Sequence, residues 1–263
     1  QNLLSLSKYK AASLYNLHRM NPKKSFEQLG FAVIPGFYNG EEIQAIDGAI
    51  ENFIAKRLPT LPAEHVFYED KNNHATLKQI QCLHKHEGFF SDLFEDKPKQ
   101  LAEELLCESV VCKNLQYFNK PPGLGKATPA HQDGFYYMLE PCRALTMWVA
   151  LDTIDEENGC VRYLPGSHTQ GMQHHVRSNV LGFSQGINDY DSRAKETPCP
   201  AQPGDLLAHH ALTIHRADAN ASTTRSRRAL GFVFYGESAT EDTPAHEAYQ
   251  RELRKELIES GKI

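Results

Sequence analysis

Apolar residues follow a helical period near both ends of the chain and form short runs between them. The clearest helical segment covers residues 39–58, where Asn39 is placed to cap a helix and Glu42 follows three positions later. Its apolar residues recur at helical spacing, namely Ile43, Ile46, Ile50, Phe53 and Ile54. Two further helices are predicted, over residues 98–105 and about 245–259, and the latter carries an apolar stripe at every fourth position.

The centre and the C-terminal third contain short aromatic or β-branched runs bounded by turn residues. These runs cover residues 115–119, 146–152, 160–165, 205–210 and 229–236. Because helices stand at the two ends with strands between them, the order favours an antiparallel sandwich or barrel buttressed by helices over alternating βαβ units. Residues 167–203 show no strong period and exceed the ~12–15 residues of an ordinary structureless loop, so we expect them to form a functional cover.

Composition and charge narrow the class of protein. The chain has 263 residues, 40% of them hydrophobic, and a net charge of −5, which argues against a general nucleic-acid or anionic-membrane binder. No repeat or linker divides it, so residues 1–263 are predicted to form one domain in which the N-terminal helices of about 1–60 buttress a β core. No signal peptide is visible and the six cysteines follow no regular spacing, which predicts reduced thiols in a cytoplasmic protein without a membrane span.

The sharpest chemical motif is the tripeptide that begins at His131 and ends at Asp133. In an extended segment these two side chains point to the same face and can converge on one ion. Alone, the pattern is more typical of a histidine hydrogen-bonded to an aspartate on a surface strand. A second histidine, His215, follows a strand-like run, and two imidazoles with one carboxylate would leave three positions open on Fe(II).

Those open positions suit a bidentate 2-oxo acid and dioxygen. An arginine beyond the distal histidine could then hold the far carboxylate of the 2-oxo acid with two hydrogen bonds. Arg225, Arg227 and Arg228 stand at the start of the last predicted strand, although most such clusters only mark a solvated strand end.

With these residues in place, the sequence resembles the phytanoyl-CoA dioxygenase family of Fe(II)/2-oxoglutarate oxygenases. The similar stretches occur in the family's order, cover about a quarter of the chain, and are residues 118–137, 147–168, 186–190, 203–215 and 227–234, with 25–37 resembling the family's opening helix and strand. This resemblance implies a mainly β fold with flanking helices, a double-stranded β-helix related to the jelly roll.

The resemblance also implies roles for particular residues. His131, Asp133 and His215 match the family's iron ligands. Arg227 matches the arginine that pairs with the tail of 2-oxoglutarate, but the segment before it looks one residue longer than usual, so Arg225 stays an alternative. The remaining co-substrate candidates are Gln116 and Trp148, with Gln79 weaker, and Ala217 stands where relatives often have serine.

The implied activity is hydroxylation of an unactivated C–H bond in a small or medium organic substrate. Dioxygen is consumed, and 2-oxoglutarate is decarboxylated to succinate and CO2. We expect residues 167–203 and the N-terminal helices to hold the substrate, and His210 to support His215. A related halogenase would need a small residue at Asp133. The other alternative is a zinc-binding or catalytically silent jelly-roll sensor, which would have no need of an arginine clamp.

Overall fold

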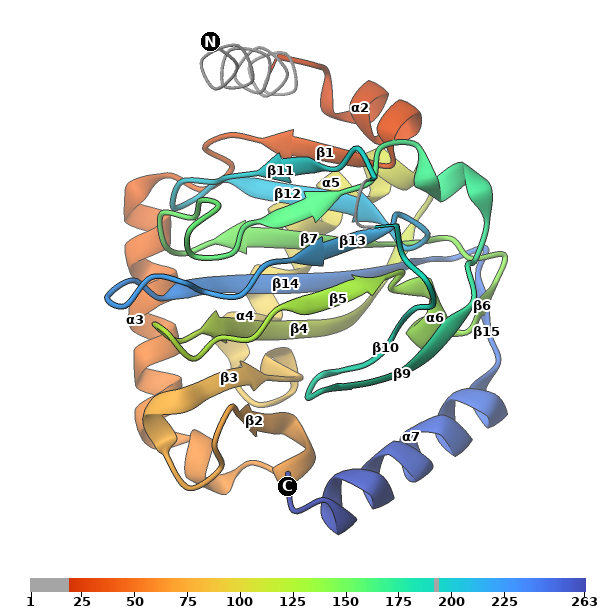
Figure 1. The fold of residues 1–263 in the computed structure, drawn as a ribbon. Helices are drawn as coiled ribbons and strands as arrows, with labels where there is room; N and C mark the ends of the chain where they lie inside the picture. Colours follow the sequence, from red (N-terminus) through yellow and green to blue (C-terminus); the bar gives the residue numbers. More distant parts are fainter. Residues whose placement is uncertain (1–18, 192–193) are drawn as a thin grey trace, which may run out of the picture.

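The structure, a computed structural model, describes residues 19–191 and 194–263 (Figure 1). Its α-helices are α2 (Pro22–Leu29), α3 (Gly40–Lys56), α4 (Gly88–Glu95), α5 (Lys97–Leu106), α6 (Gly134–Tyr137) and α7 (Thr243–Glu259). Its strands are β1 (Phe31–Ile34), β2 (Val66–Tyr68), β3 (Leu77–Ile80), β4 (Val110–Lys120), β5 (Thr128–His131), β6 (Leu139–Glu140), β7 (Ala144–Ala150), β8 (Val161–Tyr163), β9 (His175–Val180), β10 (Phe183–Ile187), β11 (Thr197–Cys199), β12 (Leu206–His210), β13 (His215–Ala217), β14 (Arg227–Gly236) and β15 (Thr240–Glu241).

The three predicted helices are confirmed as α3, α5 and α7. At the start of α3 the Asn39 side chain accepts from two backbone N–H groups, and the Glu42 side chain accepts from the Asn39 backbone, which is the reciprocal cap that the sequence indicated. The predicted opening helix and strand are α2 and β1. The part of the N-terminal prediction that falls on residues 1–18 lies outside the described residues.

Two antiparallel sheets form the body of the described structure. The larger sheet has seven strands in the order β1-β12-β7-β14-β4-β3-β2, and the smaller has four in the order β11-β8-β13-β5. All five predicted strand regions fall in these sheets, as parts of β4, β7, β8, β12 and β14. The prediction of a mainly β fold with flanking helices is therefore confirmed, and Figure 1 shows α3, α4 and α5 behind the larger sheet.

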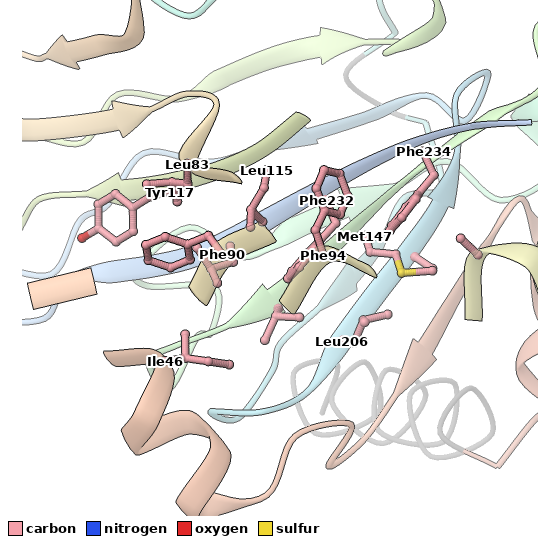
Figure 2. Packing of buried hydrophobic residues seen from close by; sticks show 14 of the residues in the cluster. Ile46, Leu83, Phe90, Phe94, Leu115, Tyr117, Met147, Leu206, Phe232 and Phe234 are labelled. Carbon is pink, nitrogen blue, oxygen red and sulfur yellow. The ribbon is translucent and has the colours of Figure 1, made fainter. Parts of the chain in front are cut away.

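Strand β14 separates a helical layer from the interior between the sheets. Its residues Leu230, Phe232 and Phe234 join the core formed with the helices, and Figure 2 shows two of them beside Phe94 of α4. Alternate residues point the other way, so Ala229 belongs to the core between the two sheets. Because both faces are covered, the strand reads as an unbroken apolar run in the sequence.

The segment 167–203, in which the sequence showed no strong period, contains regular structure. This stretch contains a short 3-10 helix (Ser167–Gln170) and three strands, two of which, β9 and β10, pair as an antiparallel hairpin. The hairpin escaped prediction because most of its β9 residues are exposed or half-buried. A strand without a fully covered face has no need of the alternating pattern that marks strands in a sequence.

The reduced thiols that the sequence predicts are present in the structure. All six cysteines are free thiols, and burial raises the pKa of Cys160 to about 11, which keeps this thiol protonated at neutral pH. Within the described ranges, the structure has no helix that is long and apolar enough to cross a membrane.

Candidate active site

Strand pairing brings the two predicted histidine ligands together. His131 is the last residue of β5, His215 is the first of β13, and the two are direct partners in the antiparallel register. Side chains opposite each other on one face of such a pair are close neighbours, and here the ring centroids lie 4.2 Å apart. The register shifts between His215 and Ala217, so a bulge follows the ligand, as is common beside active sites.

A turn, and not the pleat of a strand, places the carboxylate. Asp133 has helical backbone angles, φ −59° and ψ −34°, and caps α6, so the predicted extended geometry of the motif is wrong beyond His131. The Asp133 Oδ1 atom lies 3.3 Å from His131 Nε2 and 3.6 Å from His215 Nε2. The turn directs Gln132 away, where its amide donates to the carbonyls of Gly171 and Leu212.

The second oxygen of Asp133 is held by its own set of donors. Oδ2 accepts from Thr146 Oγ1 at 2.5 Å, from His209 Nε2 at 3.1 Å and from the Tyr137 hydroxyl at 3.3 Å. His209 in turn lies with Nδ1 3.0 Å from the buried Tyr163 hydroxyl. The carboxylate therefore keeps Oδ2 engaged by the protein and presents Oδ1 to the histidine pair.

Burial and hydrogen bonding set the protonation of these groups. Burial lowers the pKa of His215 well below its ordinary value, which favours the neutral imidazole. Burial alone would raise the pKa of Asp133, but the facing His215 and the hydrogen bonds from His131 and His209 outweigh it and keep the pKa well below the usual range. A neutral imidazole and an ionised carboxylate are the forms that bind a metal ion.

His209, and not His210, supports the centre. The two residues are neighbours in β12, so their side chains point to opposite faces of the larger sheet. His210 accepts from the Leu212 backbone N–H at 3.0 Å, and its ring packs against Phe26 and His168 on the side away from the triad. The alternation of the strand could have identified His209 from the sequence. The His209 side chain points to the same face as that of Leu207, which belongs to the core between the sheets.

Arg227 projects from β14 into the same interior. Its side chain is buried, its Nε donates to the Gly159 carbonyl at 3.1 Å, and its guanidinium carbon lies 4.1 Å from the centroid of the Trp148 ring. Among the described residues no carboxylate forms an ion pair with it. Burial lowers the pKa of Arg227 to about 9, so the side chain is still a cation at neutral pH.

The other two arginines of the cluster point elsewhere. Arg225 pairs with Asp155 at 2.9 Å and with Glu157 at 2.5 Å, outside the cavity. Arg228 turns to the helical layer, because neighbouring residues of a strand point to opposite faces, and it pairs with Asp152 and with Asp47 of α3. The structure therefore separates the two candidates for the clamp, because Arg227 alone of the three lines the interior.

The remaining co-substrate candidates line the interior beside Arg227. Gly231 of β14 is the register partner of both Trp148 and Gln116. The Trp148 and Gln116 side chains therefore lie on either side of a glycine, which has no side chain of its own. Gln79 donates to Gln116 Oε1 at 2.7 Å. Ala217 is also part of this lining and brings no hydroxyl to it.

These residues line one cavity of about 730 Å³. Its deep end contains the triad, Arg227, Trp148 and Lys120, and it runs outward between the β9–β10 hairpin and α7. Residues of the hairpin line the cavity, so part of the 167–203 segment lies where a substrate contact was expected. No residue of α2 or α3 is part of the lining, so the expectation that the N-terminal helices hold the substrate is wrong for those two helices, which cover the opposite side of the larger sheet.

Comparison with known proteins assigns the family. The model of the phytanoyl-CoA dioxygenase family matches residues 26–229. The chain belongs to the phytanoyl-CoA dioxygenase family. The peroxisomal phytanoyl-CoA dioxygenase of Rattus norvegicus is 26% identical over 258 residues, which cover 93% of this chain and 76% of the relative. Membership confirms the predicted family and the class of 2-oxoglutarate-dependent dioxygenases, while the donor set and the 2-oxoglutarate complex described next support iron and 2-oxoglutarate as cofactors.

Solved structures confirm the predicted double-stranded β-helix of this phytanoyl-CoA dioxygenase family member. EvdO2 from Micromonospora carbonacea var. aurantiaca, complexed with 2-oxoglutarate, is 25% identical with a TM-score of 0.67 over 84% of this chain and 92% of that one. The epimerase SnoN from nogalamycin biosynthesis, in complex with Fe3+ and alpha ketoglutarate, is 21% identical with a TM-score of 0.66 over 88% of this chain and 86% of that one.

The first prediction concerns the hydrogen bond that His209 donates to Asp133 Oδ2. His209→Phe keeps a ring in place but removes the donor to Asp133 Oδ2, so binding of Co(II) should weaken by about 10- to 100-fold. His209→Gln, which retains an N–H donor, should recover part of the loss, and His210→Phe should bind Co(II) like the wild type. Calorimetric titration measures all three, and unchanged affinity in His209→Phe would contradict the role given to this residue.

Proposed function

We propose that this protein is an Fe(II)- and 2-oxoglutarate-dependent hydroxylase of a small or medium organic substrate. His131, Asp133 and His215 would bind the iron, and Arg227 would hold the far carboxylate of 2-oxoglutarate. One observation carries the proposal: a triad of metal donors lines the same cavity as Arg227, a buried cation that has no carboxylate partner among the described residues.

The three side chains fit a divalent iron. One atom from each of His131, Asp133 and His215 lies within 4.8 Å of the others, and the three come from one end of the smaller sheet and the turn that follows β5. Two imidazoles and one carboxylate on a single face of the ion leave its remaining positions for exchangeable ligands. The donors on Asp133 Oδ2 favour binding through one oxygen, because they already occupy the other.

The deep end of the cavity fits a small dianion. Arg227 and Lys120 are register partners on β14 and β4, and both are buried. Lys120 donates to the Asp218 carbonyl at 2.6 Å, while burial first and then the nearby Arg227 lower its pKa well below the ordinary value. An anionic group placed here would offset the desolvated Arg227 cation and favour the protonated form of Lys120, and 2-oxoglutarate in the 25% identical EvdO2 supports this choice.

The chemistry assigns separate tasks to the residues of this chain. When bound, iron and 2-oxoglutarate supply the activation of dioxygen, with decarboxylation of 2-oxoglutarate to succinate and CO2 and transfer of one oxygen atom to the substrate. Arg227 and Trp148 orient the co-substrate, since the indole ring fixes the plane against which the guanidinium lies. Asp133 fills the position that a halogenase would leave open for chloride. Phe183, whose ring centroid lies 5.3 Å from that of His131, limits water near the reacting atoms.

A zinc-binding sensor would use the same three donors. Nothing in that function needs a buried arginine such as Arg227, whose desolvation has a cost without an anion beside it. The hydroxylase accounts for both the triad and the arginine, whereas the sensor accounts only for the triad.

Turnover of 2-oxoglutarate tests the proposed function. The purified protein with Fe(II), ascorbate and a panel of organic substrates should form succinate, and His215→Ala should lose this activity while its circular dichroism spectrum stays unchanged. His215 is one of the three proposed iron ligands among the described residues, and the helical core lies apart from it. Succinate formation in His215→Ala at the wild-type rate would contradict the assignment, and so would tight zinc binding without any iron-dependent turnover in the wild type.

Substitutions of Arg227 and Arg225 form a matched pair that tests which arginine binds 2-oxoglutarate. Removing one partner of a buried charged pair costs about 3–5 kcal/mol, so Arg227→Met should raise the 2-oxoglutarate concentration for half-maximal turnover by orders of magnitude. Iron affinity should change little, and 2-oxo acids without the second carboxylate should be less affected. Arg225→Met loses only exposed ion pairs and should behave like the wild type. The reverse result, a large defect in Arg225→Met alone, would transfer the role to Arg225.

A further inference from the structure

Helix α7 lines the cavity although it lies beyond the part of the chain that the family model matches. The match ends at residue 229, whereas α7 covers Thr243–Glu259 and contributes to the lining together with the residues that follow it. None of its residues is buried, and none belongs to a hydrophobic core cluster. The helix is therefore a wall of the cavity and no part of the packed interior.

One face of α7 turns apolar side chains toward this cavity. Tyr249, Leu253 and Leu257 follow each other at intervals of four residues, are half-buried, and all belong to the lining. Ile258 is 51% exposed and is absent from the lining, so it marks the outer side of the same helix. With a rise of ~1.5 Å per residue, the apolar face extends over about 12 Å.

Polar contacts hold α7 against the β9–β10 hairpin. The Tyr249 hydroxyl lies 2.6 Å from Ser184 Oγ of β10. Arg177 of β9 forms an ion pair with Glu256, and Lys262 donates to the Asn179 carbonyl at 3.4 Å. Exposed ion pairs contribute little to stability. These contacts and the packing of Tyr249 against Tyr136 fix where the helix lies, and they leave Leu253 and Leu257 in the cavity lining.

The hairpin completes the apolar wall and links it to the metal donors. Val180, Leu181 and Phe183 at its turn line the cavity, and the Phe183 ring stacks on Phe118 of β4 at 6.4 Å between centroids. The same Phe183 ring contacts His131. A molecule lying along α7 would thus reach the triad past Phe183 and the other apolar side chains of the hairpin turn.

We propose that α7 and the turn of the β9–β10 hairpin form the substrate-selecting wall, and that the substrate carries an extended apolar body bound against Tyr249, Leu253 and Leu257. This inference rests on the proposed function for the position of the reacting end, beside His131. Burying this apolar face against a ligand removes it from water, which is the dominant favourable contribution to such binding. Selection then resides in a helix that the family match does not include.

The test uses N-phenylnaphthylamine, a neutral apolar fluorophore that has no carboxylate for Arg227 to bind. The full chain is loaded with Zn(II) and 2-oxoglutarate, so that the deep end is filled and no turnover occurs. Trp148 is the only tryptophan of the chain and lines the cavity, so energy transfer from it to the probe reports binding at this site. Leu253→Gln with Leu257→Gln preserves side-chain length and helix propensity while removing the apolar face.

The double variant should bind the probe about ten-fold or more weakly than the wild type. The matched control Ile258→Gln changes the outer side of the same helix and should bind the probe like the wild type. Calorimetric binding of 2-oxoglutarate should be equal in all three proteins, which separates this inference from the proposed function. The inference is overturned if the wild type shows no energy transfer, if the double variant retains wild-type affinity, or if Ile258→Gln loses as much.

Discussion

The antiparallel pairing of β5 with β13 is the constraint on which the site depends. It places His131 opposite His215, although the two are far apart in the sequence, and leaves their rings in contact. The turn into α6 then adds Asp133, whose second oxygen is fixed from β7 by Thr146 and from β12 by His209. Three donors from the smaller sheet and its following turn are thus oriented by hydrogen bonds from the larger sheet, so the two sheets define the centre jointly.

Strand β14 links the candidate metal centre to the hydrophobic core that it forms with the helices. Its outward residues pack against the helices, and its inward residues begin with Arg227. A buried cation is costly to keep without a counter-charge, so the strand retains it only because the surrounding packing fixes the backbone from both sides. The same alternation directs Arg228 to Asp152 and Asp47, where its charge is compensated. Arg227 and Arg228 are thus neighbours in one strand, but the first faces the cavity and the second forms ion pairs in the helical layer.

The sequence was sufficient for the parts of the structure that local patterns determine. The cap of α3, the apolar runs of β12 and β14 and the order of the motifs predicted the helices, the sheet class and the identity of the triad. The geometry of Asp133 was not predictable, because a turn and a strand both bring positions two apart near one point. The β9–β10 hairpin was missed because its exposed residues carry no pattern, and His209 was overlooked in favour of the sequence neighbour His210, although strand alternation distinguishes them. The β9–β10 hairpin and α7 come together through tertiary contacts. The sequence of neither segment predicts that it lines the cavity.

The central claim is that the triad and Arg227 together hold 2-oxoglutarate on iron in one cavity. Anaerobic titration of the Fe(II)-loaded protein with 2-oxoglutarate, followed by visible absorption, tests it most directly, because a 2-oxo acid that chelates iron through its carboxylate and ketone gives a charge-transfer band. We expect a band that saturates at one equivalent in the wild type, and at much higher concentration in Arg227→Met with the same iron content. A wild-type protein that binds iron but shows no band, or identical titrations for the two proteins, would contradict the account.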